Sequence, residues 1–467
     1  MSKTRLCAFA LLCVFALGMS TLAIAQDESA AEPAAVQAPP AVQPEIYRRE
    51  GQVVVPESSV VHAEDAGLRA HTNHLIFVPA GRQMATVNPD DTFAETPASM
   101  GCVYKVGPIY AGCNPATGGT NHPTGGWGAI ALVDAFDNPN AGADLKFFSS
   151  FYGLPAAAFT KVYANTSFGT LNGLTASCSG KPAGDMGWGL EEDLDIEWAH
   201  VMAPAAKIIL VEACSSSNAD LEFAEQVAGT KVTADGGGEI SNSWSGAEFS
   251  GEVGASDNVF YRYHFNRISY FASAGDSGWG AQYPSSSPWV ISAGGTTVNR
   301  DANGNFVSES CWSGSGGGVS AYELWQSPPS ITNGMGPWAA FQYELAGQTA
   351  RQTPDISFNA DPASGVYVYD SYRSSPGWYI VGGTSLSSPA LAGIVNNANN
   401  RLGQTPDGGG RFATSELNLI YPQLYTHTAY HVNFYDVVTG SNGTGHNAGT
   451  GYDQCTGIGS PRGKLGK

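Results

Sequence analysis

Three short, mostly apolar runs set the strongest limit on how this chain can fold. Residues 129–133, 207–211 and 269–273 each hold consecutive apolar side chains, at 129–133, 208–211 and 270–272, which is typical of parallel strands buried on both faces. Helical stretches separate the runs, so we expect an α/β fold with a doubly wound, mainly parallel sheet and helices on both faces. Sites in such sheets lie beyond the carboxyl ends of the strands, where Asp134 and Asp276 fall.

A helix is expected from residue 190 to just before Pro204, and it carries two acids on one face. Its apolar residues recur at helical spacing: Leu190, Leu194, Trp198 and Met202. Glu191 and Asp195 are four residues apart and therefore share a face. In a protected site two such carboxyls can share a proton, which raises the apparent pKa of the pair. On the surface they would only belong to a solvated acidic face.

A serine in residues 382–389, Gly-Gly-Thr-Ser-Leu-Ser-Ser-Pro, has the sequence context of an exposed nucleophile. Ser385 lies between small residues, and Pro389 is expected in the first turn of the helix that follows. Free backbone NH groups at a helix start favour negative charge beside this serine. Taken alone, the stretch is equally compatible with a serine-rich cap of a core helix, so the assignment depends on partners elsewhere in the chain.

The first residues have the features of a secretory signal. Lys3 and Arg5 precede an apolar run, and a small-residue cleavage site ends at Ala25. We therefore expect a signal peptide at residues 1–25 and a secreted or periplasmic protein. An uncleaved membrane anchor is the alternative, but the apolar run is short, and no later stretch is long and apolar enough to span a bilayer.

Composition divides the rest of the chain into two parts. Residues 26–98 begin with an Ala-, Pro- and Gln-rich stretch and then hold only short apolar runs, which predicts a linker and a short pro-segment or extension. Residues 99–467 carry dense strand and helix signals to the end. This second part is expected to form one large α/β domain.

Six cysteines remain after the signal is removed, an even number in an oxidising compartment. Fifteen pairings are possible, and the sequence cannot choose among them. The pairing that we favour joins Cys102 to Cys113, Cys178 to Cys214, and Cys311 to Cys455. No cysteine or histidine spacing indicates a zinc site.

The charge balance excludes two classes of partner. Asp and Glu number 41 against 22 Lys and Arg, a formal net charge of −19. Such an acidic chain is a poor partner for nucleic acid or for an anionic membrane. With 58 glycines and 13% charged residues, the composition is that of a compact, loop-rich globular enzyme and not of a disordered chain.

Three separated motifs, in order, give the chain a family resemblance. Glu-x-x-Leu-Asp spans residues 191–195, Ser-Ala-Gly-Asp-Ser-Gly spans residues 273–278, and Gly-Thr-Ser-x-Ser-Ser-Pro surrounds Ser385. The match covers residues 120–467 and resembles the sedolisin family of serine-carboxyl peptidases. It implies a subtilisin-like fold and a secreted, acid-active serine-carboxyl endopeptidase that acts on polypeptide substrates, and we expect a monomer.

The resemblance also implies roles for four residues. Ser385 would be the nucleophile, Glu191 the general base and then acid, Asp195 the carboxylate that positions Glu191, and Asp276 a donor to the oxyanion. Each role is chemically reasonable, because a serine hydroxyl needs a base within hydrogen-bond reach. A carboxyl group donates to an oxyanion only when it is protonated.

A second resemblance, near the C-terminus, implies a calcium site. One structural Ca²⁺ would be held by the carboxylates of Asp436 and Asp453 and by the backbone carbonyls of Val437, Gly449 and Gly451. Hard oxygen ligands suit this ion. Without the family resemblance the stretch would be interpreted as an ordinary Gly-rich loop, because it does not follow the EF-hand order.

Several alternatives stay open at this stage. Asp134 either extends the Glu191–Asp195 pair or only caps the next loop, and Trp244 either walls the site or is a buried aromatic. A neutral Ser-His-Asp subtilisin is disfavoured, since no histidine has the matching sequence context. A catalytically inactive, secreted binding protein that retains the fold is the alternative function, and the short pro-segment keeps it open.

Overall fold

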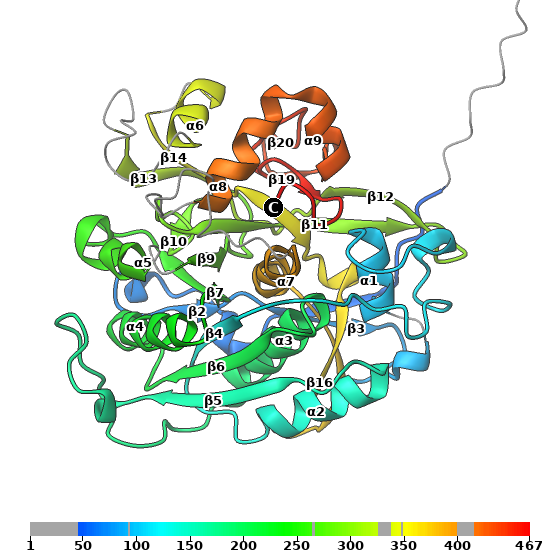
Figure 1. The fold of residues 1–467 in the computed structure, drawn as a ribbon. Coiled ribbons are helices and arrows are strands. Elements are labelled where there is room, and N and C mark those ends of the chain that lie inside the picture. The colour runs from blue at the N-terminus through cyan, green and yellow to red at the C-terminus, as the bar shows by residue number, and fades with distance from the viewer. Residues whose placement is uncertain (1–44, 92–93, 264–266, 326–337, 347–348, 399–414) are drawn as a thin grey trace, which may run out of the picture. The chain divides into compact units, whose positions relative to one another are not determined.

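The computed structural model of the chain describes residues 45–91, 94–263, 267–325, 338–346, 349–398 and 415–467 (Figure 1). The predicted signal peptide and the Ala- and Pro-rich stretch after it lie outside these residues. Within the described residues no helix is long and apolar enough to cross a membrane.

The main sheet has eight strands among the described residues, in the order β12-β11-β9-β7-β4-β6-β5, with β15 also paired to β11. All its strand pairs are parallel except β11 with β12. The strands are β4 (Ala129–Ala135), β5 (Ala158–Ala164), β6 (Lys207–Ala213), β7 (Gly238–Asn242), β9 (Ile268–Ser273), β11 (Ile291–Arg300), β12 (Phe306–Cys311) and β15 (Ile356–Asn359). The predicted fold class is confirmed, and the three apolar runs are β4, β6 and β9.

Helices cover both faces of this sheet. In β4, Ile130 and Leu132 pack into one core with α3 (Met186–Met202) and α7 (Thr384–Asn397). The intervening Ala131 and Val133 pack into a second core with α4 (Asn218–Ala234). Alternate side chains of one strand therefore reach two apolar layers, which explains why the sequence shows no polar alternation.

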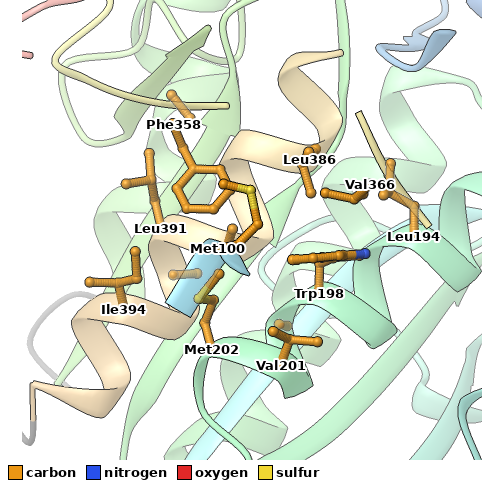
Figure 2. Packing of buried hydrophobic residues seen from close by; sticks show 14 of the residues in the cluster. Met100, Leu194, Trp198, Val201, Met202, Phe358, Val366, Leu386, Leu391 and Ile394 are labelled. Atoms are coloured by element: carbon orange, nitrogen blue, oxygen red, sulfur yellow. The ribbon is translucent and has the colours of Figure 1, made fainter. Parts of the chain in front are cut away.

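Helix α3 lies against α7, and Figure 2 shows Leu194, Trp198 and Met202 of α3 near Leu386 and Leu391 of α7. The predicted helix begins four residues earlier than expected, where the Asp185 side chain accepts from two backbone NH groups. All its residues from Trp188 to Met202 are buried. The interpretation of its acids as a solvated face is therefore wrong.

Helix α7 also begins earlier than expected, because Gly383 at its N-cap has a φ of 109°, which favours glycine. The expectation that Pro389 lies in the first turn is wrong, since this proline lies inside the helix. Its missing NH leaves the Ser385 carbonyl without the usual helical partner. The Ser243 hydroxyl lies 3.1 Å from that carbonyl oxygen and replaces the lost bond.

Residues 45–98 belong to the same unit as the rest of the described chain. They supply β1 (Gly51–Val54) and β3 (Leu75–Pro79) to a four-stranded sheet with β17 (Gly377–Gly382) and β16 (Val366–Asp370), in the order β1-β3-β17-β16. They also supply β2 (His71–Thr72), which pairs with β8 (Trp244–Ala247), and β8 pairs in turn with β10 (Gln282–Tyr283). This part of the predicted extension therefore contributes strands beside the main sheet.

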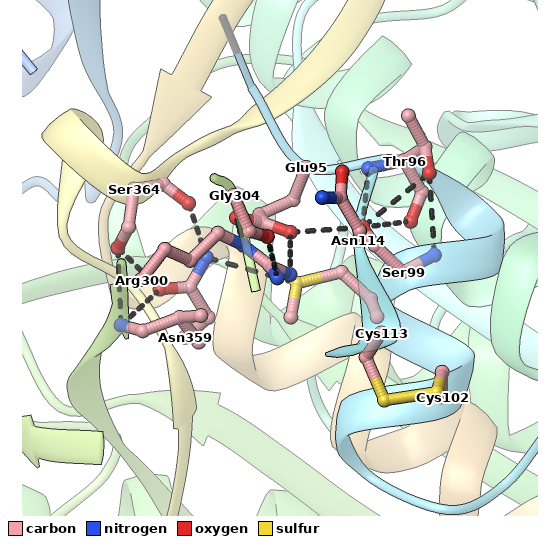
Figure 3. A network of polar contacts seen from close by, with 12 residues as sticks. Glu95, Thr96, Ser99, Cys102, Cys113, Asn114, Arg300, Gly304, Asn359 and Ser364 are labelled. Carbon is pink, nitrogen blue, oxygen red and sulfur yellow. Dashed lines mark hydrogen bonds and ion pairs between the residues drawn. A yellow bond between two sulfur atoms is a disulfide. The ribbon is translucent and has the colours of Figure 1, made fainter. Parts of the chain in front are cut away.

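A buried ionic network fixes the region that follows these strands (Figure 3). Glu95 accepts from Arg300 Nε at 2.7 Å and from the Ser99 hydroxyl at 2.8 Å, and Arg49 lies 3.3 Å away. Burial raises the pKa of Glu95, but the two arginines outweigh it and hold that pKa below its usual range. The network ties the start of the domain to the end of β11.

The remaining helices and strands complete the domain, and three disulfides join its described parts. These elements are α1 (Pro97–Val103), α2 (Ala141–Tyr152), α5 (Asp257–Tyr263), α6 (Trp338–Ala346), α8 (Ser415–Ile420), α9 (His427–Asn433), β13 (Gly318–Leu324), β14 (Ala350–Thr353), β18 (Phe434–Tyr435), β19 (Ser441–Gly443), β20 (His446–Asn447) and β21 (Ser460–Pro461). The bridges are Cys102–Cys113, Cys178–Cys214 and Cys311–Cys455. The favoured pairing is confirmed, in agreement with an oxidising compartment.

Candidate active site

Ser385 lies in the first turn of α7, just beyond the end of β17. Its hydroxyl donates to the backbone oxygen of Ser243 at 3.0 Å and accepts from the backbone NH of Asn73 at 3.1 Å. Its own NH donates to the Asn73 carbonyl oxygen at 2.9 Å. The side chain is fully buried beneath a segment of the same chain.

Helix α3 places Glu191 and Asp195 beside α7, and both carboxyl groups are fully buried. Burial raises the pKa of Glu191 well above its usual range. Hydrogen bonds from the Ser385 hydroxyl and the Asn73 NH lower this pKa, but they offset only part of the increase. Burial and the neighbouring Asp134 and Glu191 raise the pKa of Asp195. The Ser243 hydroxyl lies 2.7 Å from Asp195 Oδ1. Burial therefore disfavours ionisation of both carboxyls at once, so that one proton can be shared by the pair.

Asp134, at the carboxyl end of β4, joins the same group of acids. It is fully buried, and neither of its carboxyl oxygens has a hydrogen-bond partner among the described residues. Burial, followed by the charges of Glu191 and Glu212, raises its pKa well above the usual range. Trp244 packs nearby in the core and donates its ring NH to the carbonyl of Val133 at 3.0 Å.

Asp276 follows β9 and faces the start of α7. Its Oδ1 accepts from the backbone NH and the hydroxyl of Thr384, at 2.7 and 2.9 Å. Its Oδ2 has no partner among the described residues, and burial raises its pKa well above the usual range. A neutral Asp276 would carry its proton on Oδ2, because Oδ1 is occupied as an acceptor.

Glycine is required at position 383 by this arrangement. A Cβ atom there would collide with both Asp276 Oδ2 and the Asn73 carbonyl oxygen. These two oxygens therefore flank one small space next to the NH of Ser385. That space has the chemistry of an oxyanion site, with a backbone NH on one side and a carboxylic acid on the other.

The sequence analysis missed His74, which lies in the predicted extension. Its Nδ1 is 2.6 Å from Glu191 Oε2, and both side chains are fully buried. Burial, helped by the charge of Arg373, lowers the pKa of His74 to about 3, so the imidazole is neutral. Nothing in the local sequence around His74 marks it, because its place depends on the pairing of β2 with β8.

The predicted calcium ligands Asp436 and Asp453 lie in the C-terminal loops, where each accepts hydrogen bonds from its surroundings. Asp436 Oδ1 accepts from the NH of Gly451 at 3.0 Å and from the hydroxyl of Tyr430 at 3.1 Å. Asp453 Oδ2 accepts from the NH of Gly449 at 2.9 Å. Each carboxylate therefore accepts from the backbone NH of a residue predicted as a ligand, and carboxylate oxygens are of the kind that suits a hard cation.

A second group of acids could also hold a metal ion, and the sequence analysis did not identify it. Asp144, Asp193 and Asp370 are buried, and one carboxyl oxygen from each lies within 4.8 Å of the others. Burial raises the pKa of Asp370 to about 6. Asp144 lies on α2, Asp193 on α3 and Asp370 at the end of β16, and none of them is next to Ser385 in the sequence.

The fold and this arrangement define a subtilisin-like α/β protein in which carboxyl groups surround a helix-start serine. No model of a protein family matches the chain. Kumamolisin from Bacillus sp. (strain MN-32) is 30% identical over 327 residues, which cover 63% of this chain and 52% of kumamolisin. Sedolisin from Pseudomonas sp. (strain 101) is 30% identical over 257 residues, which cover 47% of this chain and 38% of sedolisin.

A solved structure agrees with these similarities. Pseudomonas sedolisin, a serine-carboxyl proteinase complexed with two molecules of pseudo-iodotyrostatin, superimposes with a TM-score of 0.58 at 24% identity. The match covers 79% of this chain and 96% of that one. The chain is therefore similar in sequence to kumamolisin and sedolisin and similar in fold to sedolisin, and it spans about half or less of the length of these curated relatives.

Proposed function

We propose that this chain is an exported, acid-active serine-carboxyl endopeptidase that hydrolyses polypeptides through an acyl-enzyme on Ser385. One observation carries the proposal: a buried serine hydroxyl is surrounded by carboxyl groups whose pKa values are raised. Sequence similarity to kumamolisin and sedolisin also supports the proposal. His74 is not a hydrogen-bond partner of the Ser385 hydroxyl, so a Ser-His-Asp mechanism is disfavoured.

In the proposed mechanism Ser385 Oγ attacks the substrate carbonyl carbon while Glu191 accepts the hydroxyl proton. Asp195 positions Glu191 and stabilises its charge changes, since the two share one buried face of α3. The negative oxygen of the tetrahedral intermediate accepts from the NH of Ser385 and from the protonated Oδ2 of Asp276.

The tetrahedral intermediate then breaks down to the acyl-enzyme, which water hydrolyses. Glu191 returns its proton to the leaving amine, the carbon–nitrogen bond breaks, and the acyl group stays on Ser385. A water molecule, deprotonated by Glu191, then attacks the ester carbon. The bond from that carbon to Ser385 Oγ breaks, Glu191 returns the proton to Oγ, and the acid product leaves.

Digestion of an unfolded protein across about pH 3 to 8 tests the function, a range that brackets carboxyl and histidine titration. We expect internal peptide bonds to be cut in acid by the native sequence and not by the Ser385→Ala variant, with products read by mass spectrometry. No cleavage at any pH by the folded protein would favour the inactive binding protein.

We also propose one structural Ca²⁺ at Asp436 and Asp453, with the carbonyls of Val437, Gly449 and Gly451. Such an ion would hold the C-terminal loops in place and would stabilise the folded state because it binds that state preferentially. The peptide-hydrolysis steps proposed above need no metal.

Removing calcium should therefore lower the melting temperature. Protein shown by elemental analysis to contain one calcium is heated with and without a chelator, and Asp436→Asn serves as the matched variant that should respond less. With free Ca²⁺ at about 100 times its Kd, the loss is on the order of 3 kcal/mol. An unchanged melting temperature after calcium has left would contradict the structural role.

A further inference from the structure

Residues 71–76 lie in the candidate active site in the manner of an extended peptide. Strand β2 pairs antiparallel with β8, so that His71 faces Ser245 and Thr72 faces Trp244. The NH of Asn73 continues the ladder by donating to the Ser243 carbonyl at 3.2 Å. Past this point the chain enters β3, where Leu75 pairs with Gly382 at the end of β17. The segment therefore passes directly over Ser385.

The Asn73–His74 peptide bond occupies the reacting position of this site. The Asn73 carbonyl oxygen accepts from the NH of Ser385 at 2.9 Å and shares the space at Gly383 with Asp276 Oδ2. These are the two donors proposed for the oxyanion. Asn73 thus stands where the residue on the acyl side of a cleaved bond, P1, would stand.

The Asn73 side chain fills a polar pocket and is 1% exposed. Its Nδ2 donates to the hydroxyls of Ser245 and Ser273, at 2.8 and 2.6 Å. Its Oδ1 lies 3.0 Å from the Ser245 hydroxyl, which also contacts the side-chain oxygen of Gln282. The carboxamide NH₂ therefore has two hydroxyl acceptors, and the single proton of Ser245 can be donated either to Asn73 Oδ1 or to Gln282. Ser245 and Ser273 are fully buried.

We infer that the pocket formed by Ser245, Ser273 and Gln282 selects asparagine at P1, and that the chain's own Asn73–His74 bond is such a substrate. This inference rests on the proposed function. An apolar P1 side chain would leave the pocket's buried polar groups without partners, whereas asparagine satisfies them. Sites built to hydrogen-bond one polar group reject analogues that lack it by about 10²-fold or more.

Cleavage of this bond balances without any co-reactant except water. Ser385 Oγ bonds to the Asn73 carbonyl carbon, the bond to the His74 nitrogen breaks, and the serine proton passes through Glu191 to that nitrogen. Water then hydrolyses the ester. The products are a fragment that ends in the Asn73 carboxylate and a chain with a free amine at His74.

The first test compares kcat/KM for matched peptides that differ only at P1. We expect Asn to exceed Leu by about 10²-fold or more. In Ser273→Ala that ratio should fall about tenfold, because one buried donor loses its partner. Ser385-dependent hydrolysis that prefers Leu would overturn the inference and leave the proposed function standing. Absence of any Ser385-dependent hydrolysis would overturn the proposed function instead.

A second test does not depend on turnover. In the Ser385→Ala background, Asn73→Leu should release residues 71–76 from the cleft. Their backbone amides should then exchange with deuterium about tenfold faster or more, which corresponds to a loss of about 1.4 kcal/mol of local stability. The exposed Leu68→Ala change, in the same background, is the matched control and should leave exchange unaltered. Unchanged protection in Asn73→Leu would show that the pocket does not select asparagine.

Discussion

Replacing Ser385 by alanine should lower kcat for peptide hydrolysis by about 10⁶-fold, the loss expected when the nucleophile of a serine peptidase is removed. The variant should stay folded, since only a hydroxyl that bonds the Ser243 carbonyl and the Asn73 NH is lost. Glu191→Gln keeps the volume of the buried side chain but removes the base. Its loss should be of similar size.

The double variant should be about as slow as Ser385→Ala alone, because the two groups act in one step and their losses do not add. Single-turnover kinetics with one chromogenic peptide measure the rate of hydrolysis by the wild type, the two single variants and the double variant. Circular dichroism and melting temperature check that each is folded. A double variant slower than either single one by a further factor of 10³ or more would contradict Glu191 as the base, since that size marks an independent contribution.

The free energy of unfolding should fall as the pH rises from about 5 to 8, because the folded chain holds buried carboxyl groups in their protonated form. Burial raises the pKa of Glu225 and of Glu239 well above the usual range, and neither belongs to the proposed catalytic group. Their stabilising contribution is complete below the unfolded pKa of about 4.3 and is lost as the pH rises towards the folded value. Each such group changes stability by about 1.4 kcal/mol per pH unit in that window.

Groups with the opposite sign offset this trend below about pH 6.5 but not above it. Burial lowers the pKa of His71, His74 and His200, so their contribution is lost as the pH falls below about 6.5 and is complete above it. The lowered pKa of Glu95 acts only at lower pH, because its contribution is already complete above the unfolded pKa. The decline should therefore be steepest above about pH 6.5.

Urea unfolding of the wild type and of Glu239→Gln at several pH values measures the effect. Glu239 accepts from Asn396 Nδ2 at 2.6 Å, and glutamine keeps that bond without a titrating proton. In Glu239→Gln the free energy of unfolding should fall less steeply with pH, by about 1.4 kcal/mol per pH unit. Glu64→Gln, at an exposed position, should match the wild type. Parallel slopes for the wild type and Glu239→Gln would contradict the raised pKa.

The sequence predicted the parts of the fold that depend on local pattern. The continuous apolar runs became β4, β6 and β9, because each strand packs on two faces and has no solvated side. The helix start at Ser385 was visible in its small residues. The acids of α3 were ambiguous, since the same residues at the same spacing suit either a solvated face or a buried site, and only packing against α7 decides.

Features that depend on distant pairing were not visible in the sequence. Asn73 and His74 lie more than 100 residues before Glu191 and more than 300 before Ser385, yet they contact both. No periodic pattern in the local sequence predicts these contacts, because β2 pairs with β8 only once the domain has formed. The group of Asp144, Asp193 and Asp370 was missed for the same reason.

The central claim is a serine peptidase in which Asp276 is protonated and the Glu191–Asp195 pair shares one proton. It is tested most directly by kcat/KM against pH for the wild type and Asp276→Asn. A protonated Asp276 donates to the oxyanion only below its raised pKa, so the wild type should be fastest in acid and fade towards neutral. Asparagine donates at any pH, so the variant should keep some activity. The decline of its kcat/KM on the alkaline side should shift to higher pH or be set by Glu191 and Asp195 alone. A wild-type optimum near about pH 8, where free carboxyl groups are ionised, would contradict the serine-carboxyl mechanism.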